Sequence, residues 1–149
     1  MVNIVEERTP MPPLGPGLDI VMPAVPAAAR QARRALADRQ LVQSEQEPTL
    51  LLLVSELVSN SVRHAGLAAD EPIRLRVRRD HMCAHVEVCD YGRSGSTPGR
   101  RDPVLNSLEP GGLGLKLVDE MADRWGVSRT DHQTCVWFEL ACEHSSRPA

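Results

Sequence analysis

Residues 55–66 read SELVSNSVRHAG and continue the amphipathic rhythm of the four leucines at 50–53. At about 100° per residue, the apolar stripe of this helix is formed by Leu50, Leu53, Val54, Leu57, Val58, Ser61 and Ala65. Glu56 and Asn60 lie one turn apart along an edge of this stripe, and His64 continues the row. A desolvated carboxylate without a partner costs on the order of several kcal/mol. Glu56 and Asn60 therefore need either partners inside the protein or a ligand.

The composition indicates an ordinary globular domain. The 149 residues are enough for one domain whose core needs neither disulfides nor metals. A net charge of −3 gives no general reason to expect direct binding to nucleic acid. No apolar run is long enough to span a bilayer, and the N-terminus lacks the plan of a secretion signal. We therefore expect a cytoplasmic protein without a membrane partner.

The hydrophobic pattern predicts how the domain is organised. The expected strands are 18–22, 73–79, 82–90, 126–130 and 135–141, and the expected helices are 25–41, 48–66 and 113–125. Helices on one face of a mostly antiparallel sheet would bury these patterns, so the expected fold is α+β, a two-layer α/β sandwich. Residues 1–17 are rich in Pro and Gly and are expected to form a flexible leader, and residues 143–149 a flexible tail. The domain itself then covers residues 18–142.

Four cysteines, Cys83, Cys89, Cys135 and Cys142, show no C-x-x-C spacing. A zinc or redox motif is therefore poorly supported, and reduced cysteines packed as small hydrophobic residues are expected. Strand parity places Cys83, Cys89, Cys135 and Trp137 on the outer face of the sheet. An exposed patch there would mark an interface, which is compatible with a homodimer.

A second set of residues indicates a nucleotide site. Asp90 follows the inward-facing residues of its strand, so its carboxylate points to the core side at the strand end. The segment GGLGL at 111–115 opens the third helix, and its glycines let a ligand approach free backbone N–H groups. Residues 91–112 form a long segment of the kind that is usually a functional loop or lid. Each feature alone has a structural explanation, such as a cap or a turn, but the ordered set is far more specific.

These motifs resemble those of a known superfamily. The segments Glu56-Leu-Val-Ser-Asn60, Asp90-x-Gly92 and Gly112-Leu-Gly114-Leu115 are similar to the N, G1 and G2 boxes of the GHKL (histidine-kinase-like) ATPases. Within that superfamily, the chain resembles the small bacterial anti-sigma-factor serine/threonine kinases and related ATP-binding regulators. The resemblance covers about residues 18–140 and implies the same histidine-kinase-like ATPase sandwich.

The resemblance implies a role for each matching residue. Asn60 would ligate Mg²⁺, and Glu56 would act as general base toward a hydroxyl or water. Asp90 would accept a hydrogen bond from the adenine amino group, with Thr134 nearby, and Gly92 would leave room for the base. The backbone of Gly112, Leu113 and Gly114 would bind the ATP phosphates.

Three other residues are candidates for the ATP site, each with a competing explanation. Arg100 and Arg101 in the predicted lid are candidate contacts to the γ-phosphate, although loop arginines are usually solvated. His64 matches a common histidine of the subgroup, but a hydrogen-bonded core histidine is at least as good an explanation.

Two functions remain open at this stage. The first is an ATP- and Mg²⁺-dependent serine/threonine protein kinase that phosphorylates a small antagonist protein and sequesters a sigma factor, which would make it a regulator of transcription. The retained Glu56 favours this function, since binding alone needs no base. The second is a catalytically weak ATP-binding module that holds a partner without phosphoryl transfer. It is favoured by the irregular lid, where Ser94 stands in place of a second G1 glycine and Pro110 in place of the first G2 glycine.

Overall fold

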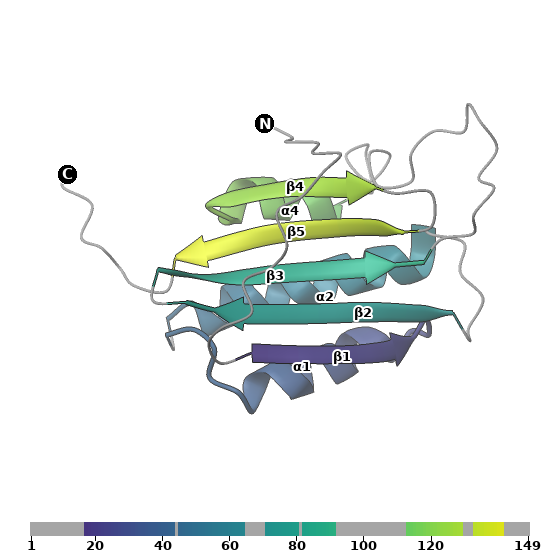
Figure 1. Cartoon of the computed structure of the whole chain (residues 1–149), viewed down its shortest axis with the longest axis horizontal. Helices are drawn as coiled ribbons and strands as arrows, with labels where there is room; N and C mark the ends of the chain where they lie inside the picture. Colours follow the sequence, from purple (N-terminus) through teal and green to yellow (C-terminus); the bar gives the residue numbers. More distant parts are fainter. Residues whose placement is uncertain are drawn as a thin grey trace.

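The computed structural model describes residues 17–43, 45–64, 71–80, 82–91, 113–129 and 133–141. Within these ranges the chain forms five strands and three helices (Figure 1). In chain order they are β1 (Gly17–Pro23), α1 (Ala28–Ala37), α2 (Glu47–His64), β2 (Pro72–Arg79), β3 (Cys83–Asp90), α4 (Leu113–Met121), β4 (Arg124–Arg129) and β5 (Thr134–Ala141). Most of the predicted leader, lid and tail, together with Ala65 and Gly66, lies outside the described residues.

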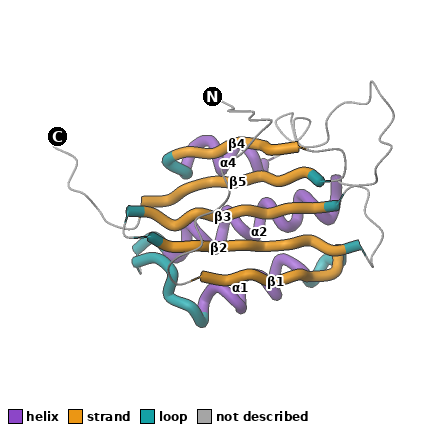
Figure 2. The backbone as a smooth tube through the Cα atoms, viewed as in Figure 1, coloured by secondary structure: helices purple, strands orange, loops and turns teal. Residues whose placement is uncertain are grey.

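The sheet is antiparallel at every described pair of strands, in the order β1-β2-β3-β5-β4. All three helices cover one of its faces, which leaves a layer of helices behind a layer of strands (Figure 2). The expected α+β two-layer sandwich is therefore confirmed. The sequence of β2 alternates apolar and basic residues, and the apolar Ile73, Leu75 and Val77 are each 0% exposed.

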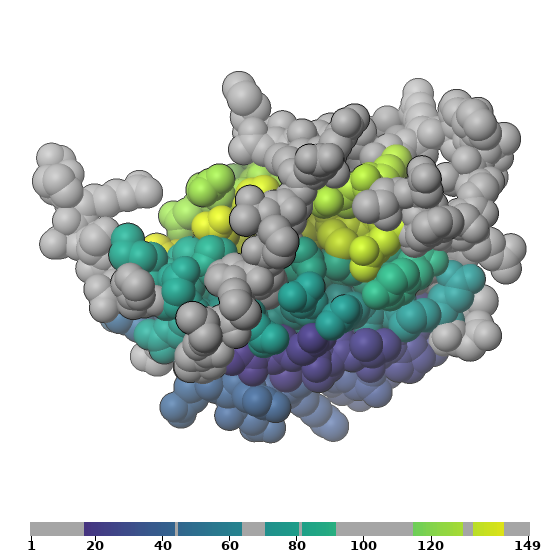
Figure 3. Space-filling model, viewed as in Figure 1, coloured from purple at the N-terminus to yellow at the C-terminus, as the bar shows by residue number. Residues whose placement is uncertain are grey.

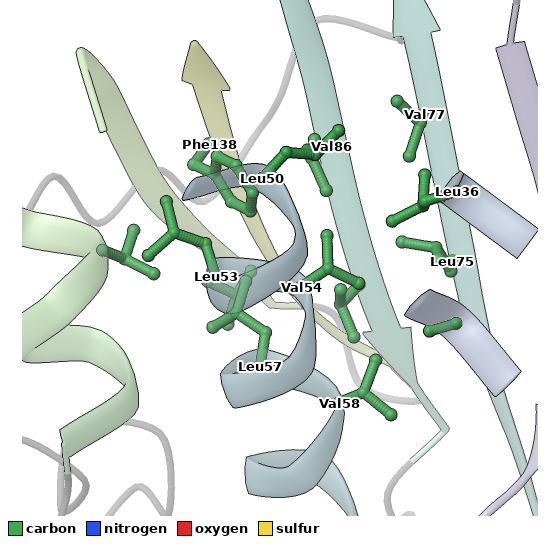
Figure 4. Close-up of a cluster of buried hydrophobic side chains, with 14 of the residues drawn as sticks. Leu36, Leu50, Leu53, Val54, Leu57, Val58, Leu75, Val77, Val86 and Phe138 are labelled. Carbon is green, nitrogen blue, oxygen red and sulfur yellow. The ribbon is translucent and has the colours of Figure 1, made fainter. Parts of the chain in front are cut away.

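The core lies between α2 and the inner face of the sheet. Leu53, Val54 and Val58 are each 0% exposed, as the apolar stripe of this helix predicts. Figure 4 shows the stripe meeting side chains from the strands, among them Val86 and Phe138. Burying one such side chain contributes about 1.5–3 kcal/mol to folding, so α2 is fixed on the sheet chiefly by this contact.

The first helix is shorter than predicted. It ends at Ala37 rather than continuing to Leu41, and Gln40 adopts a φ of 49°, which no α-helix accommodates. Leu41 and Val42 are nevertheless buried, at 2% and 7% exposure. These two apolar residues follow the helix in a segment that turns back to the core. Their hydrophobicity extended the predicted helix beyond its real end.

The third predicted helix also ends early, at Met121 instead of Trp125. Trp125 lies in β4, opposite Phe138 of β5, and its indole Nε1 donates to Asp119 Oδ1 at 2.9 Å. Met121, the last residue of α4, is 40% exposed. The helical period of Trp125 is coincidental: pairing with β5 decides its conformation, and Gly126 is a buried residue of β4.

The cysteine prediction is wrong for one pair. Cys89 and Cys135 are register partners on β3 and β5, with Cα atoms 4.1 Å apart, and they form a disulfide. They are also buried, at 2% and 8% exposure, as is Trp137 at 7%, so these residues form no exposed patch on the outer face. Spacing along the chain gave no sign of this pairing, because the register between β3 and β5 creates it.

Candidate functional site

One end of the sheet collects the ends of several elements, on the right in Figure 1. β3 ends at Asp90, and its register partner Thr134 begins β5. On the other side of β3, Asp90 pairs with Ile73 near the start of β2. Because a short segment joins α2 to β2, the C-terminal end of α2 lies at this same end of the sheet.

The N-terminal end of α4 also lies at this end of the sheet. β4 ends at Arg129, which pairs with Thr134, and begins at Arg124, which pairs with Glu139 at the far end. α4 leads into the start of β4 and packs beside it, so α4 runs back along the sheet from the Thr134 end. The first backbone N–H groups of a helix have no intrahelical partner and suit an anion. Those of α4 belong to the Leu113–Gly114 segment.

Asp90 is the acidic residue at the inner end of β3. It lies on the same face as Val86 and Val88, and only 7% of it is exposed. Thr134, opposite it, is partly buried. A carboxylate and a hydroxyl on neighbouring strands, both turned to the helix side, can form hydrogen bonds to one planar polar ligand.

Asn60 is the most informative residue of the site. It is 9% exposed, and its Oδ1 is buried without a hydrogen-bond partner. Leaving a buried polar atom unsatisfied costs about 1–3 kcal/mol. The neighbouring buried Ser55 is satisfied, since Arg33 Nη1 of α1 donates to its Oγ at 2.7 Å. A ligand bound beside α2 would supply the hydrogen-bond or metal partner that Asn60 Oδ1 lacks.

Glu56, one turn before Asn60, is partly buried. Within the described part of the chain no hydrogen bond or ion pair engages its carboxylate, and Arg63, two turns later on the same helix, is exposed. The arginine that does reach α2, Arg33, binds Ser55 instead. This contact was missed at the sequence level, because a side chain of α1 cannot be matched to one of α2 by spacing.

The remaining candidates are only partly placed. His64 is the last residue of α2, and Leu113 and Gly114 open α4, but only their backbone is described. Gly92, Arg100, Arg101 and Gly112 lie outside the described residues. The structure thus places Glu56 and Asn60 on α2, and it places Asp90, Thr134 and the first turn of α4 at the end of the sheet where α2 also ends. The proposed lid contacts lie outside the described residues.

A model of the histidine kinase-like ATPase domain matches residues 22–140 of the chain. This match runs from the end of β1 to the end of β5, and the chain belongs to the histidine kinase-like ATPase family. No curated protein is similar enough to count as a relative. Within the described ranges, no helix has the length and apolar character needed to cross a membrane.

The residues present fit the ATP and Mg²⁺ that this family implies. An amide oxygen is a hard donor of the kind that Mg²⁺ accepts, and Asn60 Oδ1 is buried with no other use for its lone pairs. The free N–H groups at the start of α4 suit phosphate, and Asp90 suits the amino group of a base.

Proposed function

We propose that the chain is an ATP- and Mg²⁺-dependent serine/threonine protein kinase of the anti-sigma-factor type. Its substrate would be a small antagonist protein, and its second partner a sigma factor, both in the cytoplasm. The observation that carries this proposal is the unpaired Oδ1 of Asn60, one turn after a partly buried Glu56 on the same helix edge. A domain that only bound nucleotide would need a metal ligand there but no carboxylate beside it.

In this proposal the chain binds ATP at the adenine base and at the phosphates. Asp90 accepts a hydrogen bond from the adenine amino group, with the Thr134 hydroxyl beside it. Gly92 leaves room for the base, and the backbone N–H groups of the segment from Gly112 to Gly114 bind the phosphates. Asn60 Oδ1 contributes a ligand to Mg²⁺, which when bound neutralises phosphate charge and orients the γ-phosphate.

Glu56 acts as the general base. Its carboxylate accepts the proton of a serine or threonine hydroxyl of the antagonist as the hydroxyl oxygen attacks the γ-phosphorus. The bond from this phosphorus to the β–γ bridging oxygen breaks, and ADP is the leaving group. His64, Arg100 and Arg101 are further candidate contacts to the phosphates.

Transfer of labelled phosphate tests this proposal. The purified chain, [γ-³²P]ATP and Mg²⁺ are incubated with size-fractionated small proteins of the source organism, and the labelled residue is identified by phosphoamino-acid analysis. We expect one small protein to acquire phosphoserine or phosphothreonine. The isosteric Glu56→Gln variant should bind Mg-ATP like the wild type and transfer at least about 100-fold more slowly. Equal transfer by this variant would contradict the role of Glu56.

A catalytically weak module that sequesters its partner is the second candidate. It is favoured by Ser94 and Pro110, which replace glycines that are usual around the lid. If this candidate is correct, the chain binds Mg-ATP and retains a partner, but no small protein becomes labelled.

A further inference from the structure

A cluster of metal-binding side chains lies at the end of the sheet opposite the nucleotide site. Asp80 follows β2, Cys83 and His85 begin β3, and Glu139 lies in β5 as the register partner of His85. Donor atoms of the first three all lie within 4.8 Å of one another. Asp90 lies seven positions after Cys83 along β3, which places the cluster roughly 23 Å from the nucleotide site.

The strand geometry explains why these side chains meet. Cys83 and His85 are two residues apart on one strand, so both side chains lie on the outer face. Cys83 Sγ is 3.2 Å from His85 Nε2, and the same nitrogen is 2.8 Å from Asp80 Oδ2. One thiol, one imidazole nitrogen and one carboxylate oxygen therefore lie within 4.8 Å of one another.

Asp80 is held in place by the backbone. Its Oδ1 accepts hydrogen bonds from the N–H groups of Met82 and Cys83, at 2.7 Å and 2.8 Å. These bonds hold Asp80 against the backbone at the start of β3 and leave the other oxygen, Oδ2, to contact His85. The carboxylate is thus positioned by the fold before any ion arrives, which lowers the entropy lost on binding.

Glu139 holds the far side of the imidazole. Its Oε1 is 3.7 Å from His85 Nδ1, and its Oε2 is 3.5 Å from Cys83 Sγ. Histidines that bind a metal through one nitrogen commonly donate the other N–H to a carboxylate, which fixes the ring and the tautomer. Glu139 Oε1, 3.7 Å from His85 Nδ1, needs a small side-chain movement to accept that N–H.

We infer that Asp80, Cys83 and His85 bind a divalent transition-metal ion of the Zn²⁺ type, with Glu139 as the positioning residue. Around a tetrahedral Zn²⁺, neighbouring ligand atoms lie roughly 3.3–3.8 Å apart. The 3.2 Å between sulfur and nitrogen is already close to this range, and the 2.8 Å between nitrogen and oxygen needs only a small side-chain movement. A water molecule completes the coordination, as in other sites with three protein ligands.

Exposure and free donor atoms favour this cluster over the second group of metal-binding side chains in the described residues. The side chains of His85, Asp80 and Glu139 are 15%, 34% and 19% exposed, so an ion can reach them from solvent. The second group of donors, Glu87, Cys89 and Cys135, is fully buried, and its two sulfurs are bonded to each other. A disulfide sulfur offers no thiolate, so that group carries no site.

Cobalt spectroscopy tests the inference. Tag-free, EDTA-treated full-length chain is titrated with Co²⁺ under argon, and then with Zn²⁺ in competition. We expect one Co²⁺ per chain, a thiolate-to-cobalt absorption band, the visible intensity of tetrahedral cobalt, and displacement by Zn²⁺. A wild-type chain without these bands would overturn the inference and leave an Asp80–His85 hydrogen bond that needs no metal.

Variants locate the ion. Cys83→Ser should abolish the thiolate band, and His85→Gln should weaken binding at least about tenfold. Glu139→Gln should weaken binding about 10–100-fold while the band remains. The exposed Asp38→Asn serves as matched control, and unchanged Mg-ATP binding shows that a variant is folded. Binding that none of the three cluster variants alters would place the ion elsewhere and contradict the assignment.

Discussion

Asp90 and Thr134 are register partners at the matching ends of β3 and β5, with both side chains on the face that the helices cover. The next pair along these strands is the disulfide between Cys89 and Cys135. A covalent bond therefore fixes the register immediately beside the two residues proposed to hold adenine. Figure 3 shows the opposite, outer face of this sheet, where β1 and β2 form a continuous surface.

The disulfide should contribute measurably to stability. It closes a segment of 46 residues, and constraining the unfolded chain to this extent contributes about 2–4 kcal/mol. Reduction, or the double substitution Cys89→Ser with Cys135→Ser, should lower the free energy of unfolding by this amount. Urea unfolding with and without reductant measures it. Identical midpoints for the two forms would show that the bond does not constrain the chain.

The leucine run offers a matched pair for testing how α2 packs. Leu53 is 0% exposed, whereas the adjacent Leu52 is 38% exposed. Leu53→Ala should cost about 2–5 kcal/mol of stability, because it leaves a cavity beneath α2. Leu52→Ala should stay within about 0.5 kcal/mol. Equal effects in chemical unfolding would mean that α2 is rotated relative to the arrangement described here.

Asn60 should show a conflict between stability and function. Its Oδ1 is buried and unpaired, so Asn60→Ala removes a group that destabilises the ligand-free protein by about 1–3 kcal/mol. This gain offsets the lost packing, and we expect the ligand-free variant to be as stable as the wild type or more so. Thermal unfolding without nucleotide checks this expectation. A loss of more than about 1 kcal/mol would show that the oxygen is already satisfied.

Acid should weaken the ion pair between Asp19 and Arg74 at the β1 edge of the sheet. Arg74 donates from Nε and Nη2 to both oxygens of Asp19, at 2.9 Å and 2.7 Å, across β1 and β2. This hydrogen bonding lowers the pKa of Asp19 below its ordinary value. The stabilisation is thus present above about pH 4, and it is lost as the pH falls toward the lowered pKa.

The pair is partly exposed, with side chains 36% and 31% accessible, so the loss should stay below about 1 kcal/mol. The free energy of unfolding of the wild type and of Asp19→Asn, measured at pH 3 and at pH 7, isolates the contribution of this pair. The difference between the two proteins should be smaller at pH 3. A difference that grows at pH 3 would contradict the assigned sign.

The local patterns predicted most of the fold. The alternation at Ile73, Leu75 and Val77 gave the faces of β2 correctly, because burial on one face leaves a period of two. The stripe of α2 was likewise correct at Leu53 and Val58. These features depend only on neighbours along the chain.

The errors share one physical cause. Trp125 fits a helical period, but its pairing with Phe138 in β5 outweighs the local pattern. The disulfide between Cys89 and Cys135, the Arg33–Ser55 hydrogen bond and the meeting of His85 with Glu139 all depend on how distant segments are brought together. A single sequence does not encode such pairings in its spacing. The unpaired oxygen of Asn60 belongs to the same class, since only the packed structure shows that nothing satisfies it.

Calorimetric titration of Mg-ATP into the purified chain tests the central claim most directly. We expect saturable binding that weakens about 10–100-fold in Asp90→Asn and in Asn60→Ala, because each substitution removes a contact worth about 1.5–3 kcal/mol. The exposed Asp38→Asn should bind like the wild type. Absence of binding by the wild-type chain, or equal affinity in all four proteins, would contradict a nucleotide site between α2 and the end of β3.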